Sequence, residues 1–282
     1  MIKKEALQGG REGKISKADD KVMRPSNVWT HQVQLFLSFM HENGFHNIPK
    51  PYGANESGME IVSYVDGVVY NNSLPSEILT DEILIEVATL LRHYHDVGEK
   101  YIPQLTGEEV WMLPKRLPIE VMCHGDFAPY NITFVNGNVH GIIDFDTLHP
   151  GPRIWDIAYA VYRWIPFVSP ANPDYCSGLK EQIRRLKVFI DAYDLGGVER
   201  KQLPDMMIER INSLVIYMRN EAEDGTLIKF EKCCKINGFQ TYQSPPSYVR
   251  GQKRGMITKY LYSMKHCPAL LTSVSHAGRF LL

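Results

Sequence analysis

The chain of 282 residues contains 31 lysines and arginines and 32 aspartates and glutamates, for a formal net charge of −1, and 44% of its residues are hydrophobic. This composition is ordinary for a globular protein, and the chain is long enough for two lobes or one large domain. No stretch approaches the roughly 20 apolar residues that a membrane-spanning helix needs, and the polar N-terminus shows no signal peptide. The five cysteines follow neither a metal-ligand spacing nor an even disulfide framework, so we expect reduced thiols in a cytoplasmic protein.

The charge is distributed unevenly along the chain. Residues 226–282 hold nine lysines and arginines and a single acidic residue, Glu231, so the rest of the chain is acidic. A basic tail is a candidate for binding nucleic acid or an acidic lobe, but this one contains no nucleic-acid motif. We therefore favour a solvated surface, expect no nucleic-acid or membrane partner, and assign residues 251–282 no role.

The N-terminal residues 5–24 are predicted to form short strands around a glycine-rich turn at residues 9–13. Glycines allow backbone N–H groups to approach phosphate oxygens closely, so this turn is a candidate phosphate contact. A flexible loop without a ligand is the alternative. The run Val22-Met23-Arg24 reads as a second strand, which favours the turn.

Two helices and a strand are expected next. Thr30 is a candidate N-terminal cap for a helix that ends at Gly44, with Val33, Phe36, Leu37 and Met40 on one face. Residues 58–65 predict a strand. A second helix opens at Thr80, with acidic residues in its first turn that suit the helix dipole, and Gly98 ends it.

The most informative stretch is residues 121–146, VMCHGDFAPYNITFVNGNVHGIIDFD. Its apolar start predicts a strand that leads into Asp126, and Asn131 follows five positions later. Two further apolar runs are joined by Asn136-Gly137, which is the strongest short signal for a β-hairpin because both turn residues must tolerate positive φ. The second of these runs ends on Asp144.

A tight hairpin folds the chain back on itself, so we expect Asp126, Asn131 and Asp144 to meet at one end of it. Two carboxylates and an amide oxygen are hard oxygen ligands that suit Mg²⁺ with bound phosphates. The spacing alone therefore predicts a magnesium–phosphate site.

Beyond the hairpin, residues 149–152 predict a sharp turn into an apolar run that contains Asp156, a carboxylate that needs hydrogen-bond donors if it is buried. Two helices are predicted at about residues 177–194 and 204–223. Their apolar stripes are typical of core packing, and Pro204 is favoured in a first helical turn.

His124-Gly125-Asp126, Asn131 and the run Ile143-Asp144-Phe145-Asp146 together resemble the signature of the aminoglycoside phosphotransferase and choline kinase-like family, small-molecule relatives of protein kinases. The resemblance implies an α+β, two-lobed protein kinase-like fold with a small β-rich N-terminal lobe and a larger, mainly helical C-terminal lobe. It implies a nucleotide-binding lobe over residues 1–66 and a catalytic and substrate lobe over residues 67–250.

The same resemblance implies roles for the polar residues of the signature. Asp126 is the expected catalytic residue, which accepts or orients the proton of the acceptor hydroxyl, while Asn131 and Asp144 are expected to hold Mg²⁺ and the nucleotide. His124 is expected to brace the loop and not to act as a base. Asp146 either supports the metal or merely ends the strand. An Asp at the position of Asp156 fastens the catalytic loop through backbone N–H groups in the family.

Two departures concern the nucleotide phosphates. Relatives carry a Lys near position 24, where this chain has Arg24, which keeps the charge and changes the geometry; a plain surface arginine is the alternative. Relatives also carry a Glu on the following helix, and no Glu occupies its early turns here. Gln32 and Gln34 are the nearest polar candidates, so the usual ion pair is in doubt.

The strand at residues 58–65 leads in the family to a hinge where backbone groups bind adenine. Ser63 and Val65 are the positions expected to do so, and a core strand without a ligand is the alternative. The acidic cluster at residues 221–224 lies where the family often meets its substrate, although an acidic helix end is usually just solvated.

The predicted function is transfer of the γ-phosphoryl group of ATP, with GTP as the alternative nucleotide, to a hydroxyl of a small, amine-bearing molecule in the presence of Mg²⁺. The expected partners are therefore a nucleotide and a small alcohol, and the oligomeric state stays open. The alternatives are a kinase for a metabolite such as choline, homoserine or a thio-sugar, a non-catalytic nucleotide-binding pseudokinase, and a metal-dependent phosphoesterase.

Overall fold

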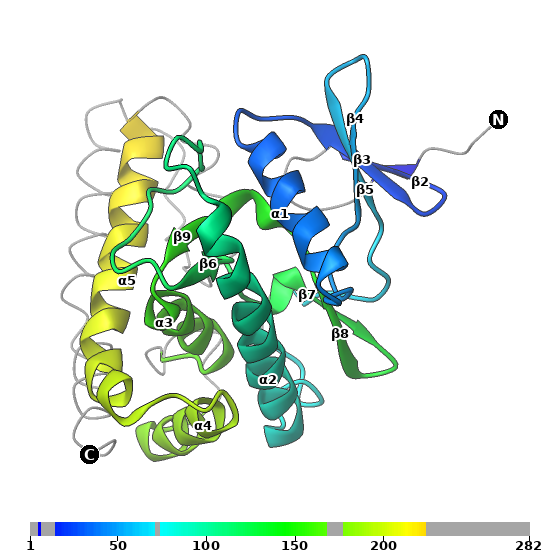
Figure 1. The fold of residues 1–282 in the computed structure, drawn as a ribbon. Helices are drawn as coiled ribbons and strands as arrows, with labels where there is room; N and C mark the ends of the chain where they lie inside the picture. Colours follow the sequence, from blue (N-terminus) through cyan, green and yellow to red (C-terminus); the bar gives the residue numbers. More distant parts are fainter. Residues whose placement is uncertain (1–4, 7–14, 71–73, 168–176, 224–282) are drawn as a thin grey trace, which may run out of the picture. The chain divides into compact units, whose positions relative to one another are not determined.

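A computed structural model describes residues 5–6, 15–70, 74–167 and 177–223 of the chain (Figure 1). The glycine-rich turn at residues 9–13 and the basic tail at 251–282 lie outside the described residues, as do the side chains of the acidic cluster at 221–224. The chain forms two compact units, one of residues 1–69 and 86–156 and the other of residues 70–85 and 157–282. The division into lobes at residue 66 stays a prediction.

The N-terminal part of the first unit is an antiparallel sheet of five strands in the order β1-β2-β3-β5-β4. The strands are β1 (Glu5–Ala6), β2 (Ser16–Ala18), β3 (Lys21–Pro25), β4 (Pro51–Ala54) and β5 (Met59–Ser63). In the β3–β5 pair, Val22 lies opposite Val62 and Arg24 lies opposite Glu60. Side chains directly opposite each other in an antiparallel pair point to the same face of the sheet, so this register brings a basic and an acidic side chain together.

The first helix, α1 (Thr30–Glu42), lies beside this sheet (Figure 1). Its buried face consists of Val33, Phe36, Leu37 and Met40, as the periodicity predicts, and the chain leaves the helix through Gly44 at a φ of +83°. The prediction that Thr30 caps the helix is wrong. Trp29 is the capping position, and the Thr30 hydroxyl accepts the N–H of Asn27 at 2.8 Å, which braces the approach to the helix.

Two small antiparallel pairs follow α2 (Asp81–Gly98) and a 3₁₀ helix (Glu99–Gln104). The strand β6 (Val121–Cys123) pairs with β9 (His149–Gly151), and β7 (Ile132–Val135) pairs with β8 (Asn138–Ile142). The turn between β7 and β8 has φ values of +52° at Asn136 and +81° at Gly137, which confirms the predicted hairpin and its turn.

The hairpin is hydrogen-bonded to the N-terminal segment of the same unit. Val68 exchanges two backbone hydrogen bonds with Phe134, at 3.0 and 2.9 Å, and Asn47 binds the far strand by donating to the carbonyl of His140 at 2.7 Å. Gly67 makes this approach possible, because a Cβ there would lie 2.7 Å from the Phe134 carbonyl oxygen. Hydrogen bonds thus fix the β7–β8 hairpin to the segment that follows β5.

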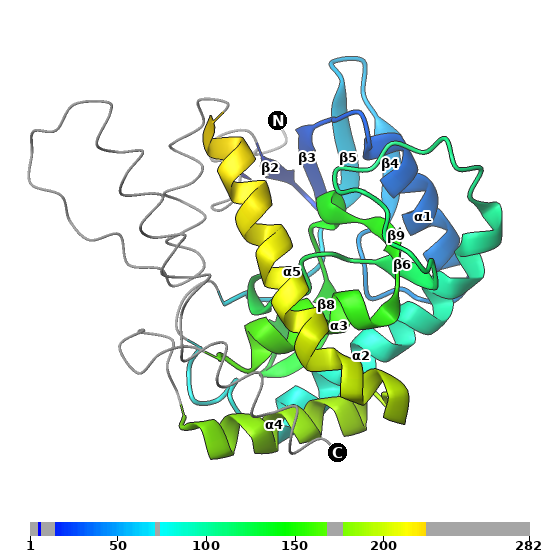
Figure 2. The same ribbon diagram turned by 90° about the vertical axis from the view of Figure 1, so that its left-hand side faces the viewer.

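The second unit is mainly helical and includes most of α3 (Arg153–Trp164), α4 (Leu179–Ala192) and α5 (Gly197–Glu223). The start of α5 follows the end of α4 after a short connection (Figure 2). The prediction that the last helix begins at Pro204 is wrong, since α5 begins at Gly197 and contains Pro204. The first turn of α5 forms before Pro204, since the N–H of Arg200 donates to the carbonyl of Gly196 at 2.9 Å. Leu203 in the next turn is fully buried.

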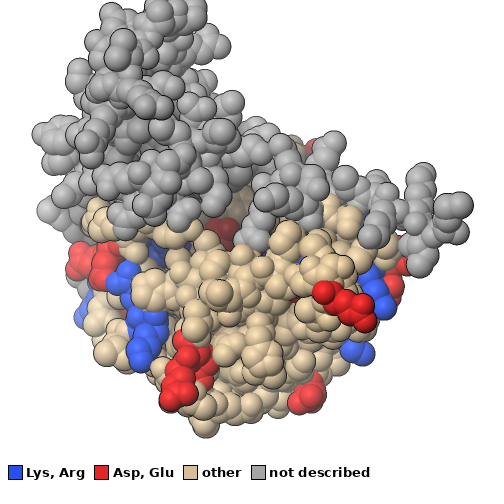
Figure 3. Space-filling view, turned by 90° about the horizontal axis from the view of Figure 1, so that it is seen from above, with Lys and Arg blue, Asp and Glu red and all other residues tan. Residues whose placement is uncertain are grey.

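On the face shown in Figure 3, the described Lys and Arg side chains are interspersed with Asp and Glu side chains. No helix in the described ranges is long and apolar enough to cross a bilayer.

Candidate active site

The buried strand β6 delivers the His124-Gly125-Asp126 loop to the surface of the first unit. All three residues of β6 are fully buried, whereas Asp126 is partly exposed. Gly125 has a φ of +81°, and a Cβ on it would lie 2.5 Å from the carbonyl oxygen of Thr147. Only glycine fits both the conformation and the space, so the loop can make its turn directly below Asp126.

Asp156, in the first turn of α3, fastens this loop from below. Its two carboxylate oxygens accept the N–H of His124 at 2.8 Å and the N–H of Gly125 at 2.9 Å, and His95 Nε2 lies 3.1 Å away. Burial alone would raise the pKa of Asp156, but the hydrogen bond and charge of His95 and the neighbouring donors outweigh it and hold the pKa at about 2. The carboxylate therefore stays ionised, and the loop-fastening role implied by the family resemblance matches its contacts.

His124 connects the loop to the strand that precedes Asp144. The N–H of Asp126 donates to His124 Nδ1 at 3.2 Å, so Nδ1 carries no proton and Nε2 donates to the carbonyl of Ile143 at 3.0 Å. Both ring nitrogens of the buried imidazole are thus used by backbone groups. This geometry is that of a brace and leaves no nitrogen to act as a base.

The carboxylate of Asp126 receives a donor on each oxygen. Asn131 Nδ2 donates to Oδ2 at 3.0 Å and to the backbone carbonyl of Asp126 at 2.9 Å. The hydroxyl of Tyr130 donates to Oδ1 at 2.6 Å, a contact that the sequence analysis missed. A carboxylate oxygen is able to accept more than one hydrogen bond, so these contacts hold the carboxylate in place without excluding a further donor.

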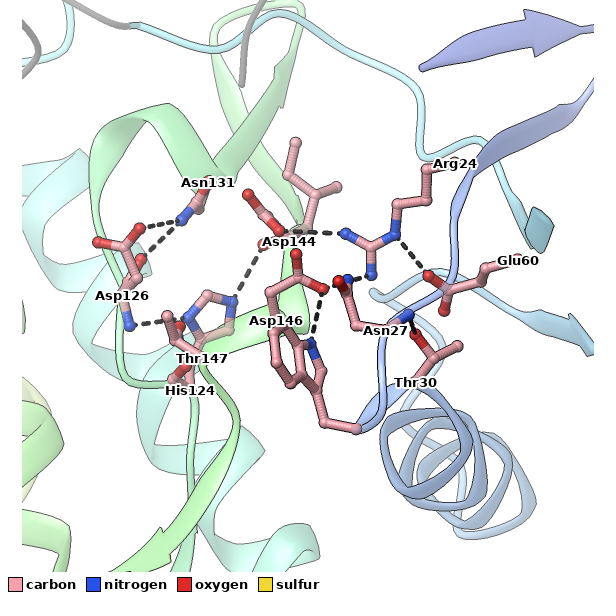
Figure 4. Close-up of polar contacts among 12 residues, drawn as sticks. Arg24, Asn27, Thr30, Glu60, His124, Asp126, Asn131, Asp144, Asp146 and Thr147 are labelled. Atoms are coloured by element: carbon pink, nitrogen blue, oxygen red, sulfur yellow. Dashed lines mark hydrogen bonds and ion pairs between the residues drawn. The ribbon is translucent and has the colours of Figure 1, made fainter. Parts of the chain in front are cut away.

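Asn131 and Asp144 lie side by side because the N–H of Ile143 donates to the carbonyl of Asn131 at 2.9 Å (Figure 4). Since Nδ2 of Asn131 is committed to Asp126, its amide oxygen is the atom left for a cation. Asp144 adopts the left-handed conformation, with φ +62° and ψ +72°, and its side chain is 51% exposed. Such strained backbone positions in non-glycine residues cluster at functional sites.

Arg24 lies among three carboxylates (Figure 4). Its Nε is 2.6 Å from Glu60, its Nη1 is 3.2 Å from Asp144 and its Nη2 is 3.1 Å from Asp146. Burial alone would lower the pKa of the guanidinium, but Asp146, Asp144 and Glu60 together raise it above its usual value. Trp29 Nε1 also donates to Asp146 at 3.4 Å. Asp146 lies in a 3₁₀ helix (Phe145–Thr147) and contacts Arg24 and Trp29, so the alternative that it merely ends the strand is wrong.

Glu60 was not foreseen as a site residue. It is 1% exposed, and its other carboxylate oxygen accepts Gln34 Nε2 of α1 at 3.2 Å. The family resemblance places the acidic partner of Arg24 on the helix, where Gln32 and Gln34 are the nearest polar candidates. A usable signal was present in the strand, because Glu60 shares the buried face of β5 with Val62 and an unpaired charge is costly there.

Ser63 and Val65, the expected adenine contacts, both contact other residues of the first unit. The N–H of Ser63 donates to the carbonyl of Lys50 at 2.8 Å, and its hydroxyl accepts the N–H of Lys50 at 2.8 Å. Val65 contacts β8, since a Cβ on Gly141 would lie 2.7 Å from its Cγ1. Their roles in nucleotide binding stay predictions, and the N–H of Ser63 is already used.

The charge of the site favours an additional cation. Arg24 contributes one positive charge against the carboxylates of Glu60, Asp144 and Asp146, so this cluster carries a net charge of −2 when all four groups are ionised. Among the described residues, no group of three His, Cys, Asp or Glu side chains is arranged to hold a metal ion by itself. A divalent cation bound here would therefore need further oxygen ligands, such as an amide oxygen, water or the phosphates of a ligand.

Part of the chain is similar in sequence to a known family. The family described as "Phosphotransferase enzyme family" matches residues 98–189, which include the His124-Gly125-Asp126 loop, Asp144 and Asp156. No curated protein sequence gives a significant match.

Several solved structures share the fold. An amicoumacin kinase in complex with AMP-PNP and Ca²⁺ has a TM-score of 0.63 at 11% identity, with 95% of this chain and 89% of that chain covered. A putative aminoglycoside phosphotransferase from Ralstonia eutropha has a TM-score of 0.58 at 14% identity, with 99% and 93% covered. A Plasmodium vivax ethanolamine kinase has a TM-score of 0.57 at 13% identity, with 100% and 83% covered. The expected α+β, protein kinase-like fold and the family resemblance are confirmed.

Proposed function

We propose that this chain, a small-molecule phosphotransferase by its family signature and fold, transfers the γ-phosphoryl group of ATP to a hydroxyl of a small, amine-bearing molecule. The observation that carries the proposal is the convergence of Asp126, Asn131 and Asp144 on one end of the β7–β8 hairpin. Asn131 contacts Asp126 through its side chain and Ile143, the neighbour of Asp144, through its backbone, and Asp144 contacts the guanidinium of Arg24.

Asp126 is the proposed catalytic residue. Its carboxylate accepts the hydrogen bond of the acceptor hydroxyl, whose oxygen attacks the γ-phosphorus as the bond to the leaving ADP oxygen breaks. The hydroxyl proton passes to the Asp126 carboxylate. Because the transition state of phosphoryl transfer is loose, this chemistry depends mainly on positioning, and a carboxylate held by Tyr130 and Asn131 meets that need.

The amide oxygen of Asn131 and the carboxylate of Asp144 are the proposed ligands of Mg²⁺. The fixed orientation of the Asn131 amide and the net charge of −2 around Arg24 both support a divalent cation. When bound with the nucleotide, the cation would neutralise charge on the phosphates. The exposed carboxylate of Asp144 is able to exchange Arg24 for such a partner.

Arg24 is the proposed phosphate-binding cation, and backbone groups near Ser63 and Val65 are the proposed adenine contacts. A guanidinium presents up to five N–H donors, so it is able to keep one carboxylate partner while binding phosphate oxygens through its terminal nitrogens. The nucleotide is ATP in this proposal, by analogy with the AMP-PNP complex of the amicoumacin kinase, and GTP is the alternative.

The class of acceptor is proposed from the similar proteins. Their names include an amicoumacin kinase, an ethanolamine kinase and aminoglycoside phosphotransferases. An amine-bearing alcohol is common to the ethanolamine and aminoglycoside substrates. Whether the acceptor is an antibiotic or a metabolite such as choline, homoserine or a thio-sugar is a choice for experiment.

A second candidate is a nucleotide-binding protein without transferase activity. One observation favours it: Arg24 contacts both Asp144 and Asp146, whose carboxylates would otherwise be available to a cation. This candidate predicts nucleotide binding without ADP release for any acceptor.

The test is a panel of aminoglycosides, macrolides, choline and homoserine, assayed for ADP or GDP release with each nucleotide. At least one acceptor should stimulate release, and Asp126→Ala should reduce that turnover by roughly 10²–10⁴-fold. Asp205→Ala, a change of an exposed aspartate on α5, is the matched control and should leave turnover unchanged. Nucleotide binding with no acceptor-stimulated release would favour the second candidate, and full turnover in Asp126→Ala would remove Asp126 from its role.

A further inference from the structure

The guanidinium of Arg24 has two kinds of partner. Glu60, on the Nε side, is 1% exposed and belongs to the sheet, whereas Asp146 and Asp144, on the two terminal nitrogens, are 17% and 51% exposed. The contact to Glu60 is also the shortest of the three, at 2.6 Å. The Nε contact is therefore the buried, permanent one, and the terminal nitrogens face groups that solvent or a ligand is able to replace.

The carboxylate of Glu60 is itself held from two directions. The register of β3 and β5 places Glu60 directly opposite Arg24. From α1, Gln34 Nε2 donates to Glu60 at 3.2 Å and to the carbonyl of Gly53 in β4 at 3.0 Å. Gln34 thus ties a helix and two strands to the carboxylate that grips Arg24 (Figure 4 shows the Arg24–Glu60 pair).

Resting on the proposed function, we propose that Glu60 and Gln34 are positioning residues that hold Arg24 by its Nε and aim its two terminal nitrogens at the nucleotide phosphates. In the structure these nitrogens contact Asp144 and Asp146. Phosphate oxygens take their place when the nucleotide binds, and Asp144 is released toward the cation. Glu60 holds Arg24 from strand β5, and Gln34 holds Glu60 from helix α1.

If Glu60 has this role, removing its charge should change the affinity for nucleotide in the direction opposite to that expected from charge alone. Removing the negative charge of Glu60 makes the surroundings of the phosphates less negative, so charge alone would tighten nucleotide binding. If Glu60 orients Arg24, the same change weakens binding, because the guanidinium is left to be drawn fully onto Asp144 and Asp146. The direction of the change in affinity therefore separates the two explanations.

The experiment is calorimetric titration of the full chain with ADP and Mg²⁺, which does not require an acceptor. Glu60→Gln should raise the dissociation constant about tenfold, the effect of losing one charge-assisted hydrogen bond. Gln34→Leu, which leaves the ion pair intact, should raise it by a smaller factor. Glu42→Gln removes the same charge from an exposed position on α1 and should bind ADP as the unaltered protein does.

A merely structural effect is separated by coupling to Arg24. In an Arg24→Met background, which keeps the apolar stem and removes the guanidinium, adding Glu60→Gln should leave the dissociation constant unchanged within about twofold. Melting temperatures recorded for each variant show whether the loss of affinity follows the loss of stability.

Unchanged or tighter ADP binding in Glu60→Gln overturns the proposal. It is also overturned if Glu60→Gln lowers the ADP affinity equally in the unaltered and the Arg24→Met backgrounds. These outcomes are distinct from failure of the proposed function. If the unaltered protein binds no ADP with Mg²⁺, both fall together. If it binds ADP and Asp126→Ala abolishes turnover while Glu60→Gln behaves as the unaltered protein, only the positioning role is wrong.

Discussion

The carboxylate of Asp156 lies 2.8 Å from the backbone nitrogen of His124, although 32 positions separate the two residues in the chain. With the second hydrogen bond from Gly125, this contact makes one buried charge responsible for the conformation of the loop that carries Asp126. The site is therefore positioned from beneath by a residue that has no contact with a substrate in the proposed mechanism.

Replacing Asp156 tests this support. Asp156→Asn keeps the shape of the side chain but loses the charge that two backbone N–H groups and His95 share, so it should lower the free energy of unfolding by roughly 1–3 kcal/mol. Urea denaturation gives the value, and Asp205→Asn on the surface of α5 serves as the comparison. Equal stability of the two variants would show that the loop holds its shape without Asp156.

The low pKa of Asp156 predicts how stability depends on pH. Its folded pKa of about 2 lies below the ordinary value of 3.8, so the unfolded chain binds the proton more readily. The carboxylate thus contributes about 2 kcal/mol above pH 4, and this is lost as the pH falls from about 4 to 2. His95, whose pKa is lowered chiefly by burial, acts in the same direction below pH 6.5. Unfolding free energies measured from pH 7 to 3 should fall less steeply in Asp156→Asn than in the unaltered protein.

Gly125 and Gly137 form a matched pair of glycines with the same φ of +81°. At Gly137 an added Cβ meets nothing within 4 Å, so Gly137→Ala should cost only the backbone strain of about 1–2 kcal/mol. At Gly125 the Cβ also meets the Thr147 carbonyl at 2.5 Å, so Gly125→Ala should be more destabilising and should reduce turnover. The melting temperatures of both variants make the comparison. Equal decreases would mean that the loop adjusts to a Cβ at position 125 without further loss of stability.

Asp144→Asn tests the proposed metal ligand. The variant should lose most of the additional thermal stabilisation that Mg²⁺ gives in the presence of ATP, because a neutral amide is a weaker ligand than a carboxylate. The shift with ATP alone should change little. A Mg²⁺-dependent shift of the original size would exclude Asp144 as a ligand.

Tyr130→Phe removes the hydroxyl that donates to Asp126 at 2.6 Å. If this bond holds the catalytic carboxylate in place, kcat should fall about tenfold, as expected for a hydrogen bond to a charged group, while the KM for nucleotide stays the same. Tyr52→Phe changes an exposed tyrosine of β4 in the same way and should leave both constants unchanged. A kcat equal to that of the control would show that the Tyr130 hydroxyl is not needed to hold the carboxylate.

Much of the site follows from local patterns that the sequence displays. The Asn136-Gly137 turn, the apolar runs beside it and the spacing from Asp126 to Asp144 predicted a hairpin with the polar residues at one end, and the hairpin has this form. The buried face of α1 was readable from its helical period. These features depend on neighbours within a few positions, so the chain encodes them without reference to its distant parts.

The partners of Arg24 were decided by the tertiary structure alone. Glu60 lies 36 positions away and Asp144 lies 120 positions away, and they reach Arg24 only because β3 pairs with β5 in one register and the β7–β8 hairpin is bonded to the same frame. An alternating strand pattern shows which residues face inward but not which strand lies opposite or in which register. Strand pairing depends on long-range burial and hydrogen bonding, and so the sequence did not reveal that Arg24 has an acidic partner on a strand in place of the helix Glu of its relatives.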